Sequence, residues 1–276
     1  MVVTRKHLVR DFQRLGLKRG DAVLVHSALS AIGQVQGGAD TVIDALLDVI
    51  GSEGTLLMPA LSAKVFDVKN SHTWTGTIPE VFRQRKGVLR SFHPTHSVTA
   101  CGARAGELTT GHLECPTACG EGTPYVKLMD TGGKILLIGV DQDRNTALHT
   151  LEDIADAPYL STYSAQYLDP ETGKMKTLTM KRFPGPHRDF IGLDHLFREA
   201  GVMQIGKVGR AVCRLIDAAG MRVVGLRALR ADPAAALCSN PNCTDCVMQR
   251  AKIKRHRLSR EDFQLSAVSD AAGHGL

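Results

Sequence analysis

Apolar runs and amphipathic segments alternate along the first part of the chain. Residues 4–16 have the apolar spacing of a helix, and residues 22–25 form a continuous apolar run with strand character. A second helical pattern spans residues 39–50, and another apolar run follows it at residues 54–59. A strand, a helix and a strand in this order predict two parallel strands joined by a crossover helix, as in α/β proteins.

The stretch around which the chain is organised is residues 133–152. Residues 135–138 form an apolar run typical of a buried strand, and Gly139 ends it. A polar loop follows, and we expect Asn145 or Thr146 to cap the next helix, because a short side-chain oxygen there accepts an orphan backbone N–H. The sequence therefore predicts a strand, a polar loop and a helix start.

A histidine and a carboxylate lie on this predicted helix. His149 falls in the first turn and Glu152 three residues later, so both side chains share one helix face. Since ligands bind at the carboxyl ends of strands in open α/β sheets, this face would border a binding site. A histidine exchanges protons near neutral pH, and a carboxylate fixes its tautomer. Taken alone, the pair is more typical of a helix start in which the carboxylate complements the dipole.

Two further polar segments adjoin predicted strands. Residues 26–33 form a loop rich in small residues between a strand and a helix, a geometry that offers backbone N–H groups to a phosphate. They lack the glycine patterns of dinucleotide-binding folds and of P-loops, so alone they fit an ordinary connection.

Residues 93–98 contain His93 and His96 around Pro94, which favours an extended or turning backbone. A His-x-x-His pair without a helix or nearby carboxylates is poor spacing for zinc.

The remaining segments differ in pattern. Residues 160–182 alternate in polarity around a turn sequence at residues 169–173, which predicts a β-hairpin. A helix is expected at residues 191–201. Short strands are expected near residues 202–208, 212–217 and 222–226. The long irregular loop at residues 62–80 carries Trp74, the only tryptophan, and loops of this length are usually functional or mobile.

The composition is that of a globular protein. Of 276 residues, 43% are hydrophobic and 22% are charged, which allows a substantial core in one large α/β domain. The amphipathic start lacks the apolar run of a signal peptide and no segment reaches membrane-spanning length, so we expect a cytoplasmic protein without a membrane partner. Seven cysteines, an odd number, are scattered along the chain, which favours reduced thiols over a disulfide framework.

The net charge of +6 is unevenly distributed. Much of the excess lies in one C-terminal run of basic residues, Arg250, Lys252, Lys254, Arg255, Arg257 and Arg260. No aromatic residues that would stack on bases are interleaved with this run, so nucleic acid is not the expected partner. The central stretch is acidic instead, with Asp141, Asp143, Glu152, Asp153 and Asp156. An acidic pocket on a basic chain indicates a cationic substrate.

Three of the cysteines lie close together near the C-terminus. Cys238, Cys243 and Cys246 have a spacing that suits a soft metal, as in a zinc knuckle. A tetrahedral site needs a fourth ligand and none is obvious in the sequence, so we assign no metal and leave zinc binding open. A zinc-binding nucleic-acid module is therefore one alternative function, in which binding would fall steeply with salt.

Four stretches together resemble the aminoglycoside 3-N-acetyltransferase family, a class of antibiotic acetyltransferases distinct from the GNAT fold. The stretches are residues 24–30 with Gly37 and Gly38, 54–59, 93–98 and 133–152. Each is weak alone, but their order and spacing make the combination specific. The resemblance runs from about residue 5 to about residue 250.

The resemblance implies an α/β fold in which a central mixed sheet is flanked by helices. It also implies one antibiotic N-acetyltransferase domain over residues 1–276, with a helix and hairpin portion at about 150–200 and a cysteine-rich basic tail at about 238–276. The implied activity is acetyl-CoA-dependent N-acetylation of the 3-amino group of an aminoglycoside, which confers resistance. The partner would be a cationic amino sugar, and a homodimer stays open.

The resemblance and the chemistry of the residues together assign roles. His149 matches the general base of the family, and Glu152 would orient it. Acetyl-CoA, the cosubstrate, would bind at His26, Ser27, Ala28, Leu29, Ser30, Gly33, Thr95, His96, Ser97 and Val98. The candidates for binding the acceptor are Asp67, Trp74, Asp143, Asn145, Asp153 and Asp156. The oxyanion would be stabilised by backbone N–H groups near Ser97 and Val98, or by the hydroxyl of Thr95 or Thr146.

Two alternative functions also involve CoA but differ in the acceptor or in whether the acetyl group is transferred. The acceptor could be a different small-molecule amine of secondary metabolism, which only a substrate screen separates from an aminoglycoside. The chain could also bind CoA tightly without consuming the acetyl group.

Overall fold

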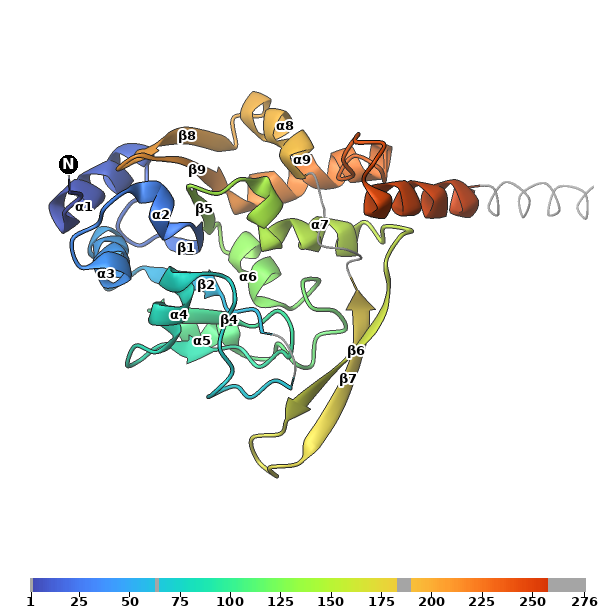
Figure 1. Ribbon diagram of the computed structural model, residues 1–276, viewed down its shortest axis with the longest axis horizontal. Coiled ribbons are helices and arrows are strands. Elements are labelled where there is room, and N and C mark those ends of the chain that lie inside the picture. Colours follow the sequence, from blue (N-terminus) through green and yellow to red (C-terminus); the bar gives the residue numbers. More distant parts are fainter. Residues whose placement is uncertain (1, 63–64, 183–189, 258–276) are drawn as a thin grey trace, which may run out of the picture.

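The computed structural model describes residues 2–62, 65–182 and 190–257, whose arrangement is shown in Figure 1. The predictions that concern residues 183–189 and the tail beyond residue 257, including Arg260, lie outside the described residues. In the described ranges a sheet forms the centre, helices cover both of its faces and a long hairpin projects from one side.

The central sheet has seven strands and is mixed. The strands are β1 Ala22–Ser27, β2 Thr55–Pro59, β3 Leu89–Arg90, β4 Val98–Gly102, β5 Lys134–Ile138, β8 Met203–Val208 and β9 Ala211–Asp217. Their order across the sheet is β3-β4-β2-β1-β5-β9-β8. β1 pairs in parallel with β2 and β5, and the outer strands pair antiparallel. The predicted parallel strand, helix and strand unit and the predicted mixed sheet are both confirmed.

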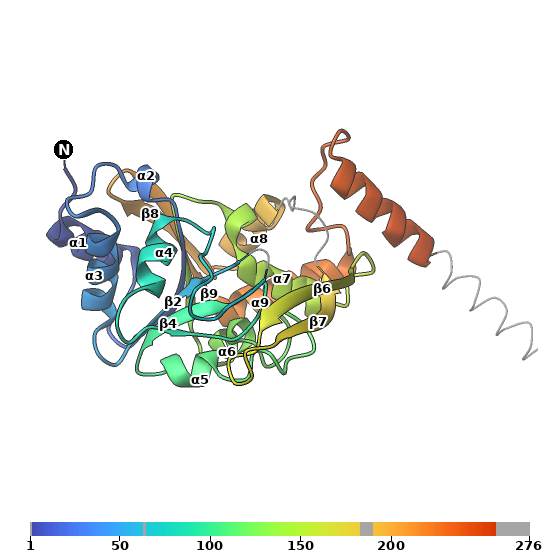
Figure 2. The ribbon, with the colours of Figure 1, turned by 60° about the horizontal axis from the view of Figure 1, so that its bottom comes forward.

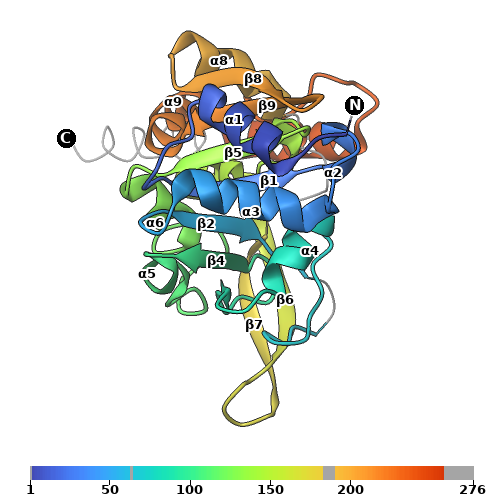
Figure 3. The ribbon, with the colours of Figure 1, turned by 90° about the vertical axis from the view of Figure 1, so that its left-hand side faces the viewer.

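Helices cover the two faces of this sheet. They are α1 Arg5–Leu15, α2 Leu29–Ile32, α3 Gly38–Ile50, α4 Thr77–Arg83, α5 Ala105–Thr109, α6 Pro124–Asp130, α7 His149–Ile154, α8 Asp194–Glu199 and α9 Ala218–Ala231. α1 and α3 lie on one face, as Figure 3 shows, and pack on Val23 and Val25 of β1. α6, α7 and α9 pack on the opposite face, where Leu24 belongs to the other core cluster. Because both faces are covered, β1, β2 and β5 are buried along nearly their whole length rather than at alternate positions.

The predicted hairpin is confirmed. β6 Ser161–Leu168 and β7 Met175–Arg182 form a separate two-stranded sheet. Asp169 shapes the turn, because its side chain accepts hydrogen bonds from the backbone N–H groups of Glu171 and Thr172, each at 2.9 Å. The hairpin is attached to the long loop that carries Trp74 through a bridge between Phe66 and Tyr167.

The strand predicted at residues 222–226 is wrong, because these residues lie inside α9. The side chain of Asp217 caps this helix by accepting from Gly220 N. The buried positions Ala218, Met221, Gly225 and Leu229 have helical spacing, whereas Val223 is exposed. The β-branched pair at 223–224 suggested a strand, but the cap and the spacing determine a helix.

The predicted cap of the helix that carries His149 is also wrong. Two short 3-10 turns, η1 Gln142–Arg144 and η2 Thr146–Leu148, precede α7, and neither Asn145 nor Thr146 makes a side-chain cap hydrogen bond. Asn145 Nδ2 instead donates to Gln142 Oε1 at 2.9 Å. The loop is therefore held by its own buried amides, and His149 still lies at the start of the helix.

A further helix spans residues 244–257 and follows the three clustered cysteines. In Figure 2 it lies at the end of the molecule remote from the N-terminus. Among the described residues, no helix has the length and apolar character that crossing a bilayer would require.

Candidate active site

His149 and Glu152 form a hydrogen-bonded pair on α7. His149 Nδ1 lies 2.6 Å from Glu152 Oε2, and the hydroxyl of Tyr159 donates to Glu152 Oε1 at 2.9 Å. Glu152 is fully buried, whereas the His149 side chain is 21% exposed. An ionised carboxylate only accepts hydrogen bonds, so Nδ1 of His149 carries the proton in this contact and the ring orientation is fixed.

His149 lines a cavity of about 620 Å³. The cavity lies where β1 and β5 end, since Ser27 closes β1 and Val140 follows β5 in its wall. Other parts of the wall come from the long loop, which contributes Trp74, and from the hairpin, which contributes Lys181. The ligand site expected at the strand ends is therefore present, and the histidine faces it.

A second cavity of about 530 Å³ adjoins the first, and Ser27 lines both. Its wall consists of Ser27, Ala28, Leu29, Ser30, Gly33, Val35, Gly38, Gly76 and Thr77. Here α3 begins after Gly37, whose positive φ of 77° suits glycine and brings the chain into the helix without a side-chain cap. The first-turn N–H groups of α3 lack partners within the helix, so this cavity suits an anionic group such as a phosphate.

Two further histidines stand in the wall beside His149. His26 Nε2 accepts a hydrogen bond from Thr146 N at 3.1 Å, and burial lowers the pKa of His26 to about 3. Burial, together with His149 and His112, also lowers the pKa of His96 to about 3. Both rings are therefore neutral near pH 7. Of the three histidines in the wall, His149 is the one that is paired with a carboxylate.

The predicted cosubstrate residues divide into two sets. His26, Thr95 and His96 line the first cavity, and the set Ser27, Ala28, Leu29, Ser30 and Gly33 lines the second. Ser97 and Val98 line neither, because both are buried behind the wall. Ser97 Oγ donates to Ala60 O at 2.6 Å, and Val98 N donates to Ser91 Oγ at 2.8 Å. The Val98 N–H is thus already engaged, which argues against its use as an oxyanion donor.

The predicted acceptor residues are only partly brought together. Trp74, which is 64% exposed, Asp143 and Asn145 line the first cavity. Asp67 lies outside it and caps a turn by accepting from Lys69 N and Asn70 N.

Asp153 and Asp156 also lie outside the cavity wall. They contact the ammonium group of Lys181, at 3.7 Å and 2.9 Å respectively, and Asp153 accepts a hydrogen bond from the Thr117 hydroxyl. One ammonium group therefore offsets part of the charge of these two carboxylates, and neither of them lines the cavity.

Three residues of the site were not predicted from the sequence. Tyr159 fixes Glu152, the Phe190 ring contacts the His149 ring edge-on at 5.4 Å between centroids, and Lys181 brings a cation into the wall. Phe190 and Lys181 come from distant parts of the chain, and no local pattern marks them. Tyr159 lies seven residues after Glu152, but α7 ends at Ile154, so helix geometry does not place the two side chains together.

Comparison with known proteins agrees with this geometry. The family profile described as aminoglycoside 3-N-acetyltransferase matches residues 24–229. Aminoglycoside N(3)-acetyltransferase VII of Streptomyces paromomycinus is 38% identical over 180 residues, which cover 56% of this chain. The match spans 62% of the length of that relative.

Solved structures of the family are also similar over most of the chain. AAC-IIIb, in a binary structure with CoASH, has a TM-score of 0.77 and 31% identity, and the match covers 84% of this chain and 97% of that one. AAC(3)-IVa in complex with a gentamicin has a TM-score of 0.84 and 27% identity, covering 91% and 98% of the two chains.

The chain belongs to the aminoglycoside 3-N-acetyltransferase family. The predicted family and the predicted mixed α/β fold are confirmed. For the family as a whole, the acyltransferase class and the use of acetyl-CoA as cosubstrate are confirmed as well.

Proposed function

We propose that this protein transfers the acetyl group of acetyl-CoA to the 3-amino group of an aminoglycoside, with His149 as the general base, and thereby confers resistance. The observation that carries the proposal is the buried Glu152 carboxylate bound to Nδ1 of a histidine that lines a cavity at the strand ends. Family membership supplies the reaction class, and a relative of this fold was solved with CoASH.

The second cavity is the proposed site of the CoA phosphates. It offers the N-terminus of α3 and a glycine-rich wall to an anion. The Arg210 guanidinium lies against Gly33, where a side chain in place of the glycine hydrogen would meet Arg210 Nε at 2.8 Å. Because the two cavities share Ser27, a cosubstrate anchored in the second would extend its thioester into the first, beside His149.

In the proposed step the acceptor nitrogen attacks the thioester carbonyl carbon. An amino-sugar amine is largely an ammonium ion near neutral pH, and an ammonium ion has no lone pair, so the acceptor first releases one proton to solvent. His149 then removes a second proton from the neutral amine as the C–N bond forms. Nε2 receives it, because Nδ1 is engaged with Glu152, and the carboxylate stabilises the resulting imidazolium. When the C–S bond breaks, the imidazolium returns the proton to the CoA thiolate, which leaves as the thiol.

The charge of the tetrahedral oxygen needs a hydrogen-bond donor in the cavity wall. Since the Val98 N–H donates to Ser91 Oγ, the hydroxyls of Thr95 and Thr146 are the better candidates. Thr95 Oγ1 also contacts His96 Nδ1 at 2.8 Å, which links it to a ring that burial keeps neutral.

The charges in the wall of the first cavity favour a second class of acceptor. This class is an amine that carries fewer positive charges than an aminoglycoside. Among the described residues that line the first cavity, Asp143 is the sole carboxylate and Arg144 and Lys181 are the cations, of which Lys181 is paired with Asp156 outside the wall. Asp143 Oδ2 also lies 3.2 Å from Arg144 Nε. A polycationic ligand gains most from several uncompensated carboxylates, and this wall provides few.

A thiol-release assay separates the two acceptor classes. Acetyl-CoA would be mixed with the enzyme and with a panel of gentamicin-like and apramycin-like aminoglycosides, matched by small monoamines, and the product of each positive reaction located by NMR. We expect CoA release with an aminoglycoside and an acetyl group on its 3-amino nitrogen. Turnover of monoamines alone would replace the acceptor, and the absence of turnover with any amine would contradict the proposed activity.

A further inference from the structure

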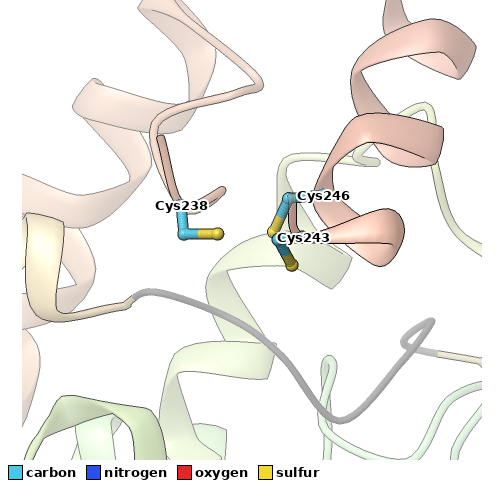
Figure 4. A group of neighbouring side chains, drawn as sticks. All are labelled: Cys238, Cys243 and Cys246. Atoms are coloured by element: carbon cyan, nitrogen blue, oxygen red, sulfur yellow. The ribbon is translucent and has the colours of Figure 1, made fainter. Parts of the chain in front are cut away.

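Three cysteines gather at the start of the last described helix, outside the walls of both cavities. Figure 4 shows Cys238, Cys243 and Cys246 close together, with the sulfur atom of Cys238 directed toward the other two residues. The three Sγ atoms lie within 4.8 Å of one another. None of the seven cysteines, all of which belong to the described ranges, forms a disulfide.

Local structure explains why the sulfurs converge. Cys243 directly precedes the helix at residues 244–257 and Cys246 lies in its first turn, so their side chains point to one side. A turn closes before them, because Cys243 N donates to Asn240 O at 3.1 Å.

The third cysteine is held in place from the helix. Arg250 Nη2 donates to Leu237 O at 3.0 Å and to Cys238 O at 3.1 Å. These two hydrogen bonds attach the segment that carries Cys238 to the helix. Cys246 is buried while Cys238 and Cys243 are partly exposed, which leaves an approach to the cluster from solvent.

We propose that Cys238, Cys243 and Cys246 are the protein ligands of a Zn²⁺ ion. Tetrahedral zinc with Zn–S bonds of about 2.3 Å requires sulfurs about 3.8 Å apart, so no pair has to move by more than about 1 Å. Thiolates select soft or borderline ions such as Zn²⁺ over Mg²⁺ and Ca²⁺. The spacing Cys-x4-Cys-x2-Cys around a turn and a helix start suits this geometry. These three ligands from the described residues leave one position of the tetrahedron open.

The role of this ion is structural. None of the three cysteines lines either cavity. Cys246 and Ile253 belong to a small apolar cluster with Ala157, Tyr159 and Leu237, and Lys252 Nζ donates to Tyr159 O at 3.4 Å. An ion that fixes the helix therefore also fixes the segment of Tyr159, whose hydroxyl holds Glu152.

The test is metal analysis of the full chain, produced without a polyhistidine tag and purified without chelators. Inductively coupled plasma mass spectrometry should find about one zinc ion per chain in the wild type. Cys243→Ser and Cys246→Ser should each lose it, whereas Cys101→Ser, a partly exposed cysteine outside the cluster, should retain it.

Cobalt substitution of the wild-type chain gives a second readout that does not depend on the stability of any variant. Sulfur-to-cobalt charge transfer and the d–d bands of tetrahedral Co²⁺ should appear on loading and disappear when zinc is added. A wild-type chain that holds no metal after loading, a disulfide found among the three cysteines by thiol titration, or full zinc content in Cys243→Ser would each overturn the proposal.

Discussion

Glu152 has no exposed surface, and each of its two oxygens accepts a hydrogen bond, one from His149 and one from Tyr159. A buried carboxylate without such partners would cost several kcal/mol, so this arrangement is stable because both oxygens are satisfied. The negative charge then acts directly on the imidazole that contacts it. We therefore interpret Glu152 as a positioning residue that acts through His149.

Glu152→Gln keeps the shape of the side chain and removes its charge. We expect kcat/KM to fall, by no more than the about 10²–10⁴-fold that a general base itself supplies, because an uncharged partner stabilises the imidazolium less. KM for acetyl-CoA should change little, since Glu152 lines neither cavity. The matched control is Asp153→Asn, the neighbouring acid whose oxygen faces Thr117. An equal loss of kcat/KM in Glu152→Gln and Asp153→Asn would show that the loss comes from a structural change and not from the charge of Glu152.

The turn after β5 depends on Gly139. Its φ is +64°, and a side chain there would place Cβ 2.2 Å from the Cβ of Ala31, next to the loop that borders the second cavity. Gly139→Ala should therefore suffer both backbone strain of about 1–2 kcal/mol and overpacking of about 1–3 kcal/mol.

Gly132→Ala is the matched control for this prediction. Gly132 has a φ of +68°, but no atom lies within 4 Å of the position of an added Cβ. Urea denaturation should show the smaller strain cost alone in Gly132→Ala and a larger loss of unfolding free energy in Gly139→Ala. Equal losses in the two variants would contradict the close packing of β5 against Ala31.

Elements with strong periodicity were predictable from the sequence, and contacts between elements were not. The apolar runs of β1, β2 and β5 and the alternating hairpin have the spacing that their burial requires. α9 was mistaken for a strand because Val223 and Val224 have high β propensity, although the cap at Asp217 determines a helix.

The site was predictable only where it is local. His149 and Glu152 are three residues apart, so helical geometry alone places them together. Asp153 and Asp156 were expected to bind a cationic substrate, but they lie outside the cavity wall and contact Lys181, which the hairpin brings to them. The role of Tyr159 follows from tertiary packing that no sequence pattern shows.

The molecule as a whole contains several histidines that folding keeps neutral. Burial lowers the pKa of His26 to about 3 and that of His112 to about 4, and it holds the pKa of His93 well below its usual range. In the unfolded chain these groups titrate near 6.5. Their contribution to stability is therefore complete above about pH 6.5 and is lost as the pH falls toward 4, because the unfolded chain binds protons first.

His112→Gln tests this pH dependence. His112 accepts from Ser91 and donates to Ala118 O, and an amide can do both without titrating. The unfolding free energy of the wild type should fall more steeply than that of the variant between about pH 6.5 and pH 5, by up to about 1.4 kcal/mol per pH unit. Urea denaturation at several pH values measures both slopes.

The exposed His195, replaced by Gln, provides the control and should keep the wild-type slope. The wild type and the variant have the same carboxylates. Glu80, whose pKa its hydrogen bond to Arg83 lowers, and Asp153, whose pKa burial raises, therefore contribute equally to both slopes. Parallel slopes for the wild type and His112→Gln would contradict the buried neutral state of this histidine.

The most direct test of the account is the turnover of His149→Ala with acetyl-CoA and an acceptor identified by the screen, measured beside CoA binding by calorimetry. We predict that turnover falls by about 10²–10⁴-fold while the affinity for CoA is preserved, because the base acts on the acceptor nitrogen and not on the phosphates. His195→Ala, on the exposed side of α8, should behave as the wild type. A His149→Ala enzyme that turns over at nearly the wild-type rate would contradict the assignment of this imidazole as the base.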